Sequence, residues 1–433
     1  MIFAKVAVGV NIKSSGGSYT YEIPKELFGQ INVGQIVLVP FRNKKIAGLV
    51  LEVTKTKPPF TTKKLEKVLL NDKVPDHLLK IIDFISEYYI TSYGSALSSV
   101  IPLNLFTKNR RAISDKKKGE KKIIDLKELT PDQSAVFNTI NESLNSNTQS
   151  KFLIFGVTGS GKTEIYAHLI SETLKKGKKA IVLVPEISLT PQTFNYFENR
   201  FQGKVALWHS DLKETEKHSM WQELQSGKKT IVIGSRSAIF SPLENLGIII
   251  IDEEQRFGVS AKEKLRTLRV NVDTLTLTAT PIPRTLQFSL MGARDLSIIN
   301  TPPPNRQPII TEVHSFNEEI IRTAIMFEVS RNGQVFFINN NIQNIPEIEK
   351  MINKLCPDIR TVVGHGQMKS ADLENLFINF INGNYDVLIS TTIVENGLDI
   401  PNCNTIIINN GHEFGLSDLY QLRGRVGRSN RRA

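Results

Sequence analysis

The sequence predicts an α/β protein with two lobes, each built on a parallel sheet covered by helices, and a small β-rich domain in front of them. Three observations carry this prediction. Short alternating apolar segments fill roughly the first 60 residues. From Leu129 onward, buried-strand patterns alternate with helical stretches. The same alternation restarts after TPPPNRQPII, which predicts a second lobe and a hinge near Pro302.

The amino-terminal segments VAVGV, YTYEI, QIVLVPF and KIAGLVLEV are divided by Gly, Pro and Asn, a pattern typical of a small antiparallel barrel or sandwich. HLLKIIDFISEYYI follows, with apolar residues at helical spacing. We assign this domain to residues 1–107. Tyr19, Tyr21 and Phe41 have alternating neighbours, which favours core positions, while stacking on nucleic-acid bases stays open as the alternative.

Positive charge is concentrated in the front of the chain. Residues 1–127 hold 22 Lys and Arg against 11 Asp and Glu, whereas residues 128–433 hold 32 of each. The segment Lys108–Lys122 has eight basic and two acidic residues and no apolar periodicity, so residues 108–127 are interpreted as a basic linker. A basic module attached to a neutral one indicates polyanion binding, and a basic surface kept for solubility is the alternative.

Several classes of protein are disfavoured by composition. No stretch of eighteen apolar residues occurs, and the first residues lack the pattern of a signal peptide. We therefore expect a soluble, cytoplasmic protein without membrane contact. Cys356 and Cys403 are the two cysteines and have no CxxC spacing, so we expect both in the core, with no disulfide framework and no zinc.

The clearest chemical motif is GVTGSGKT, which follows the apolar segment FLIF and fits GxxxxGK[ST]. Such a loop surrounds phosphates with backbone N–H groups, its lysine neutralises the β and γ oxygens, and its hydroxyl residue can ligate Mg²⁺. The motif predicts ATP and Mg²⁺ as ligands. The predicted nucleotide-binding residues are Gly156, Thr158, Gly159, Ser160, Gly161, Lys162 and Thr163, with Thr163 also a metal ligand.

A second acidic motif, IIIIDEE, ends a buried strand pattern. Asp252 is placed to hold the Mg²⁺ shell and Glu253 to polarise an attacking water. The alternative, a helix N-terminus without catalytic role, is disfavoured by the spacing from the phosphate loop. Near the other end of the chain, QLRGRVGR places Arg425 and Arg428 where a neighbouring lobe can reach the γ-phosphate, and a plain basic patch is the alternative.

Together these motifs resemble the superfamily 2 DNA helicases over nearly all of residues 129–433, which implies two RecA-like lobes at 128–300 and 301–433. LTPDQ resembles the adenine-reading Q motif, and VPEISLTPQ, GSRSA, GHGQM and STTIVENGLDIP resemble motifs that contact DNA or sense nucleotide. TATPIPRT resembles the motif that couples hydrolysis to movement. The resemblance implies nucleotide contacts by Gln133, Gln421 and Asp399, and DNA contacts by Pro185, Glu186, Gly234, Ser235, Arg236, Gly364, His365 and Thr391.

The resemblance divides within the acidic motif. Residues 1–254 are similar to the primosomal replication-restart helicase family PriA, and residues 255–433 to the translocase module of the transcription-repair coupling factor family Mfd and its relative RecG, so the chain is interpreted as a mosaic. The zinc-binding cysteines of the restart family are absent, which again predicts no zinc. NNNIQN carries Asn340 and Asn341 where Mfd relatives have a ring and a cation. Lobe two is expected to be truncated after the QLRGRVGR motif.

The resemblance implies an ATP-dependent DNA helicase or translocase that acts on forked or branched DNA in replication restart and DNA repair. Expected partners are DNA, as forks, 3′ ends, single strands and duplex, and replication-restart or repair proteins. Two alternatives stay open. One is an ATP-hydrolysing RNA helicase that shares the same core, and the other is a DNA-binding scaffold with weak ATPase activity.

Overall fold

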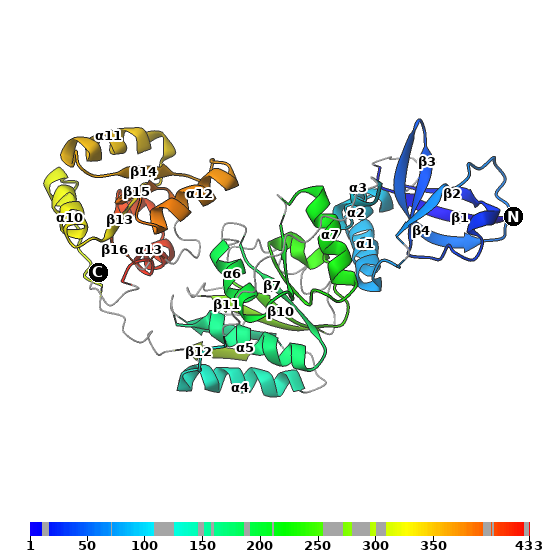
Figure 1. The fold of residues 1–433 in the computed structure, drawn as a ribbon, viewed down its shortest axis with the longest axis horizontal. Helices are drawn as coiled ribbons and strands as arrows, with labels where there is room; N and C mark the ends of the chain where they lie inside the picture. Colours follow the sequence, from blue (N-terminus) through cyan, green and yellow to red (C-terminus); the bar gives the residue numbers. More distant parts are fainter. Residues whose placement is uncertain are drawn as a thin grey trace.

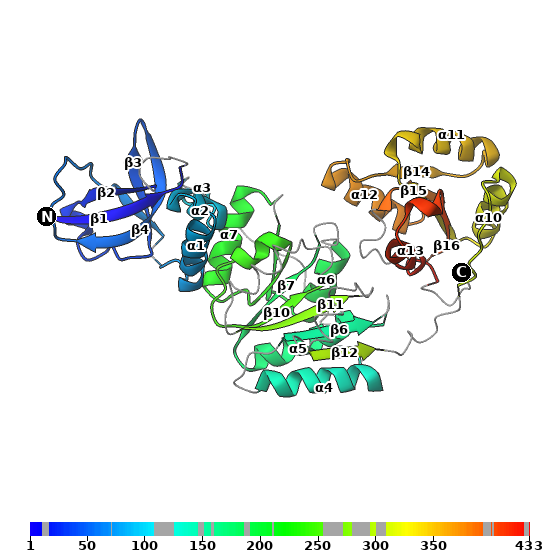
Figure 2. The same cartoon turned by 180° about the vertical axis from the view of Figure 1, so that it is seen from behind.

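The computed structural model places three sheets in a row, with the largest in the middle (Figures 1 and 2). It describes residues 1–10, 17–70, 72–107, 125–145, 151–156, 160–185, 191–209, 212–253, 272–278, 295–299, 309–392, 400, 402–427 and 433. The interpreted hinge near Pro302, most of the basic linker, and most of the segment TATPIPRT lie outside the described residues.

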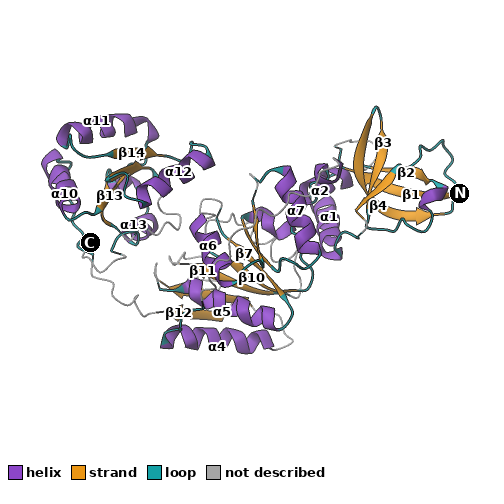
Figure 3. Ribbon diagram, viewed as in Figure 1, coloured by secondary structure: helices purple, strands orange, loops and turns teal. Residues whose placement is uncertain are grey.

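The amino-terminal domain is a five-stranded antiparallel sheet of order β2-β1-β4-β3-β5, followed by helices (Figure 3). Its elements are β1 Ile2–Val8, β2 Ser18–Ile23, η1 Lys25–Leu27, β3 Ile36–Phe41, β4 Lys44–Thr54, β5 Lys67–Leu70, α1 Asp76–Tyr88, α2 Tyr93–Val100 and α3 Asn104–Thr107. Tyr21 is buried in the core, as the alternation predicts, and the half-buried ring of Tyr19 contacts the ring edge of Phe41 at a centroid distance of 5.1 Å.

Lobe one is a seven-stranded parallel sheet of order β12-β6-β11-β10-β7-β9-β8. Its elements are α4 Pro131–Asn145, β6 Lys151–Gly156, α5 Lys162–Lys175, β7 Lys179–Leu183, α6 Pro191–Arg200, β8 Val205–Trp208, α7 Glu214–Gln225, β9 Ile231–Gly234, η3 Arg236–Phe240, β10 Leu246–Ile251, β11 Asp273–Thr278 and β12 Asp295–Ile299. Because side chains alternate along a strand, Ile248 and Ile250 pack with α4, α5 and α6, while Ile249 and Ile251 pack with α7.

Lobe two is a four-stranded parallel sheet of order β14-β15-β13-β16, and its buried strands QVFFI and VLIS read as continuous apolar runs because helices cover both faces. Its elements are α10 Glu318–Ser330, β13 Gln334–Ile338, η5 Ile342–Asn344, α11 Ile345–Leu355, β14 Thr361–Gly364, α12 Ser370–Ile381, β15 Val387–Ser390, β16 Cys403–Ile408, η7 Gly411–Glu413 and α13 Leu416–Arg423. Cys356 and Cys403 are buried in this lobe, as predicted. The predicted fold class is therefore confirmed.

The amino-terminal domain is packed directly on lobe one. A single apolar cluster runs from β1 and β3 through α1, α2 and α3 to Trp208 and Trp221 of lobe one. The ring of Phe106 on α3 lies 5.8 Å from the rings of both His218 and Trp221 on α7. Polar contacts add to the interface: the amide Nε2 of Gln225 donates to the carbonyl of Lys73 at 3.3 Å. The amino-terminal domain and lobe one therefore share one apolar core.

Among the helices that the structure describes, none is long and apolar enough to cross a membrane.

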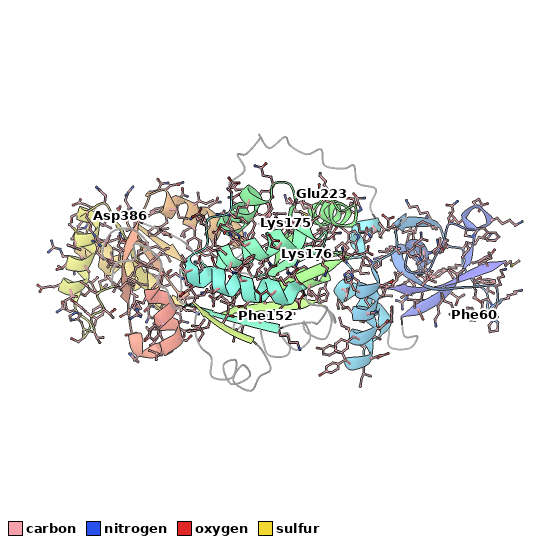
Figure 4. The ribbon with its side chains drawn as sticks, turned by 90° about the horizontal axis from the view of Figure 1, so that it is seen from below. Phe60, Phe152, Lys175, Lys176, Glu223 and Asp386 are labelled. Carbon is pink, nitrogen blue, oxygen red and sulfur yellow. The ribbon has the colours of Figure 1, made fainter. Side chains whose placement is uncertain are left out.

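We predict that Phe106→Ala weakens this packing. Truncating a buried phenylalanine costs about 3–5 kcal/mol, and Phe106 is only 6% exposed. The free energy of unfolding is measurable by denaturant titration followed by tryptophan fluorescence, since both tryptophans of the chain lie in this cluster. Phe60→Ala is the control, because Phe60 is 58% exposed and lies far from lobe one (Figure 4). Equal unfolding midpoints for the two variants would contradict the docking.

Candidate active site

The parallel pairing of lobe one gathers the predicted catalytic residues at one edge of the sheet. β6 leads into the phosphate loop, β10 leads into Asp252, and β11 pairs with both strands. Since neighbouring strands lie about 4.8 Å apart, the ends of β6 and β10 are separated by roughly 10 Å. Lys162 at the start of α5 and Asp252 after β10 therefore face one space at the carboxyl ends of the strands.

The phosphate loop turns into α5 through Gly161, which has a left-handed backbone with φ of +78°. A Cβ atom at this position would meet the Gln133 amide nitrogen at 2.3 Å, so only glycine fits. The first N–H groups of α5 point out of the helix, where they favour an anion. The ammonium of Lys162 donates to the carbonyl of Gly156 at 2.6 Å, across the loop.

The residues present fit a nucleotide with Mg²⁺. The Ser160 hydroxyl is buried and has no hydrogen-bond partner among the residues that the structure describes. The Thr163 hydroxyl accepts a hydrogen bond from Tyr166 at 3.1 Å and keeps a lone pair for a metal ion. Thr158 and Gly159, the remaining predicted contacts of this loop, lie outside the described residues.

Gln133, the predicted adenine contact, is brought to the loop and is buried. Its amide nitrogen donates to the carbonyl of Ser160 at 2.9 Å, and its amide oxygen accepts from the backbone N–H of Thr130 at 3.0 Å. In this state the side chain supports the phosphate loop. A contact with the base stays a prediction.

The pKa of the Asp252 carboxyl group is raised by some neighbours and lowered by others. Burial raises its pKa to about 6, and the nearby charge of Glu253 acts in the same direction, while Lys162 and then Arg425 act in the opposite direction. The backbone N–H of Glu253 also donates to the Asp252 carboxylate at 3.0 Å. Glu253 itself has a positive φ of 48°, a strained conformation for a residue with a side chain. A bound divalent cation would offset the free-energy cost of placing the two negative carboxylates side by side.

A charge of lobe two acts on the acidic residue of this site. Gln421 on α13 and Arg425 just after it are both buried, and the charge of Arg425 acts on Asp252 of lobe one. Arg428 and Asp399, the other residues of lobe two expected at the nucleotide, lie outside the described residues.

The candidate DNA contacts form two groups, each at the ends of adjacent strands. In lobe one, Pro185 follows β7, and Gly234, Ser235 and Arg236 end or follow β9, which pairs with β7. In lobe two, Gly364 and His365 end or follow β14, and Thr391 follows β15, its neighbour. Glu186 lies outside the described residues. Asn340 and Asn341 are exposed beside η5.

Sequence reasoning missed four residues beside this site, namely Glu164 and Tyr166 on α5 and Tyr196 and Arg200 on α6. One signal was available: Glu164 and Tyr166 directly follow the phosphate-loop motif. Glu164 is a charged residue on a helical face that is otherwise apolar.

Comparison with known families accounts for this geometry. Residues 130–288 match the DEAD/DEAH box helicase family, and residues 316–430 match the helicase conserved C-terminal domain. Residues 5–102 match the 3'DNA-binding domain (3'BD) of PriA. Both lobes therefore match helicase domains, which supports a superfamily 2 helicase. The predicted resemblance is thereby confirmed, with PriA-like and Mfd/RecG-like segments.

Two curated relatives are transcription-repair-coupling factors. The protein from Borreliella burgdorferi is 44% identical over 309 residues, 70% of this chain and 28% of the relative, and that from Staphylococcus aureus is 43% identical over 309 residues, 70% of this chain and 26% of the relative. The chain thus spans little more than a quarter of their length. The 309 aligned residues are more than the segment after Glu254 contains, so this similarity also includes residues before Glu254.

A solved structure with a similar fold is that of RecG bound to a three-way DNA junction. It has a TM-score of 0.57 and 31% sequence identity, covering 70% of this chain and 41% of that chain. The match supports the Mfd/RecG resemblance of the helicase lobes.

We predict that Asp252→Asn stabilises the protein when no nucleotide is added. The pKa of Asp252 is about 6 in the folded protein and 3.8 for an unperturbed aspartate. Ionisation of Asp252 therefore destabilises the folded state relative to the unfolded chain. This penalty is absent below about pH 4, grows as pH rises toward 6, and is complete above it. The melting temperature of Asp252→Asn should exceed that of the parent protein at pH 8 and approach it at pH 4. An equal difference at both pH values would contradict the assignment.

Proposed function

We propose that this chain is an ATP-driven motor that moves on DNA and acts on forked or branched DNA in replication restart and repair. The observation that supports the proposal best is the pairing of β6, β11 and β10, which brings Lys162 and Asp252 to the same end of the sheet, where the charge of Arg425 from lobe two also lowers the pKa of Asp252. A site made by two lobes allows binding and hydrolysis of a nucleotide to change how the lobes sit relative to each other.

The chain's own residues have distinct roles in this proposal. Lys162 binds and neutralises the terminal phosphates, and Thr163 and Asp252 orient the metal. Glu253 accepts the proton of the attacking water, and Arg425 with Arg428 stabilises charge as the phosphate bond breaks. Bound Mg²⁺ supplies the positive charge that polarises the γ-phosphate. Gln133 fixes the loop through Ser160.

The amino-terminal domain supports DNA as the track. It matches a 3'DNA-binding domain. Exposed cations also lie on the β3–β4 hairpin and on the segment of residues 63–67. The exposed cations of this basic patch are Arg42, Lys44, Lys45, Lys63, Lys64 and Lys67. The Lys63 ammonium lies 3.5 Å from the carbonyl of Arg42, so the two segments form one patch. Phosphate contacts of this kind supply most sequence-independent affinity for DNA.

The relatives support DNA over RNA. A transcription-repair-coupling factor is 44% identical to this chain over 309 residues, and a RecG bound to a three-way DNA junction is 31% identical. An RNA helicase is the second candidate, and a scaffold with weak ATPase activity is the third. ATP turnover measured with forked, single-stranded and blunt duplex DNA, and with RNA of the same sequence, separates them. Highest stimulation by forked DNA supports the proposal, and stimulation by RNA alone would refute it.

Two substitutions test the assigned roles. Lys162→Ala is expected to abolish nucleotide binding, because the phosphates lose their neutralising charge. Glu253→Gln is expected to retain binding and to lose turnover by a factor of about 10² or more, because only the water-activating step is removed. Binding of a fluorescent ATP analogue and phosphate release report the two steps. Turnover that survives in either variant would show that the site is misassigned.

A charge substitution tests the DNA track. Replacing Lys44, Lys45 and Lys63 by Gln should weaken fork binding and flatten its salt dependence, by about 0.9 in the slope of log K against log salt for each phosphate that is no longer neutralised. The control replaces Lys175 and Lys176, at the end of α5 farthest from the phosphate loop (Figure 4), and Lys178, which follows the helix. Equal salt-dependence slopes for the two triple variants would contradict DNA binding by the basic patch and favour a role in solubility.

A further inference from the structure

Glu164 is a buried carboxylate beside the phosphate loop to which the proposed function assigns no role. It is the third residue of α5, one position after Thr163. Its side chain is only 11% exposed, on the face of lobe one that α4, α5 and α6 cover. A buried carboxylate is costly unless hydrogen bonds and charges satisfy it, so the arrangement of its partners is informative.

The partners of Glu164 come from separate parts of the chain. One carboxylate oxygen accepts from the backbone N–H of Lys127 at 2.9 Å. The other accepts from the hydroxyl of Tyr196 on α6 at 2.6 Å and lies 3.7 Å from the guanidinium of Arg200. Burial, followed by the bond to Glu164, raises the pKa of Tyr196 above its usual range, so the hydroxyl stays a donor.

Within this cluster, the two residues of α6, Tyr196 and Arg200, contact each other closely. The Arg200 guanidinium carbon lies 3.7 Å from the centre of the Tyr196 ring, and Arg200 also donates to the Tyr196 carbonyl at 3.1 Å. The Arg200 side chain is 7% exposed. Because the pair is desolvated, its charge and ring contacts count for more than they would at the surface. A displacement of α6 would therefore act on the Glu164 carboxylate.

A second connection between the helices runs through aromatic rings. Tyr166, two residues after Glu164, stacks on Phe197 of α6 with ring centroids 5.8 Å apart and an angle of 20° between the planes. The hydroxyl of the same Tyr166 donates to Thr163. The ring of Phe197 also meets that of Tyr196 edge-on at 5.0 Å. The first turn of α5 is thus held by α6 on two sides.

We propose that Glu164 is a positioning residue that transmits movement of α6 to the first turn of α5, and so couples DNA binding to the placement of the Thr163 hydroxyl. The inference rests on the proposed function, in which α6 begins within the DNA-contacting motif Val184–Gln192. The carboxylate touches no nucleotide in this scheme. It holds α5, α6 and the segment around Lys127 that precedes the Q motif in one arrangement.

Three variants test the proposal. Glu164→Gln replaces a carboxylate that accepts from two donors by an amide with one acceptor oxygen, and Tyr196→Phe removes one of those donors while keeping the ring under Arg200. Glu172→Gln is the matched control, since Glu172 lies on the same helix and pairs at the surface with Lys175 at 2.6 Å. ATP turnover is measured with and without forked DNA, together with binding of a fluorescent ATP analogue and the melting temperature.

The expected result is that Glu164→Gln and Tyr196→Phe bind the analogue and turn over ATP without DNA like the parent protein, while stimulation by DNA falls about fivefold or more, the range of typical coupling effects. Glu172→Gln should keep full stimulation. Normal stimulation in Tyr196→Phe overturns the inference, and so does a loss of nucleotide binding or basal turnover equal to the loss of stimulation. If Glu164→Gln does not fold, Tyr196→Phe decides alone. If DNA does not stimulate ATP turnover by the parent protein, both the proposed function and the inference are overturned. If DNA stimulates the parent protein and the variants equally, only the inference is overturned.

Discussion

The parallel pairing of β6, β11 and β10 is the constraint on which the rest of this molecule depends. Those three strands bring the phosphate loop and Asp252 to the same edge although about 90 residues separate them in the chain. Parallel pairing requires helices on both faces of the sheet, since each crossover returns over one face. The helices that satisfy this requirement are also the ones that hold the site: α5 presents Lys162 and Thr163, and α6 packs beside it.

The site is held at a cost in stability. Two adjacent carboxylates, Asp252 and Glu253, share a desolvated space, and Glu253 has a left-handed backbone. A left-handed backbone at a residue with a side chain raises the free energy of the folded state by of order 1–3 kcal/mol and persists only where the surrounding structure enforces it. Here the surroundings are the buried strand β10 on one side and the cations Lys162 and Arg425 on the other. A site strained without ligand gains most from binding a nucleotide with its metal ion, which favours closure of the two lobes.

The sequence was sufficient to predict the three sheets, the main strands and the nucleotide edge, because the phosphate-loop pattern carries its own structural context and a buried parallel strand reads as a continuous apolar run. It was not sufficient for contacts between distant segments. Phe106 and Trp221 are ordinary apolar residues in the sequence, and no local pattern shows that α3 docks on α7. Glu164 likewise has partners 37 and 32 residues away on the chain. The hydrogen bond from Gln133 to Ser160 could not be predicted from the sequence. The motif identifies Gln133 as a nucleotide contact but does not indicate which residue it contacts when no nucleotide is bound.

The amino-terminal domain and the nucleotide residues lie at different parts of the sheet of lobe one. The amino-terminal domain packs on the face that carries α7, next to the edge strand β8, whereas the nucleotide residues lie around β6 and β10. A sheet with continuous hydrogen bonding across seven strands resists bending, so the docked domain and the phosphate loop keep a fixed relation. Movement of lobe two against lobe one is then also movement against the amino-terminal domain. Under the proposed function, a DNA strand bound by the basic patch of that domain and by the strand ends of lobe two would be displaced by each change between the lobes, without any change inside the amino-terminal domain.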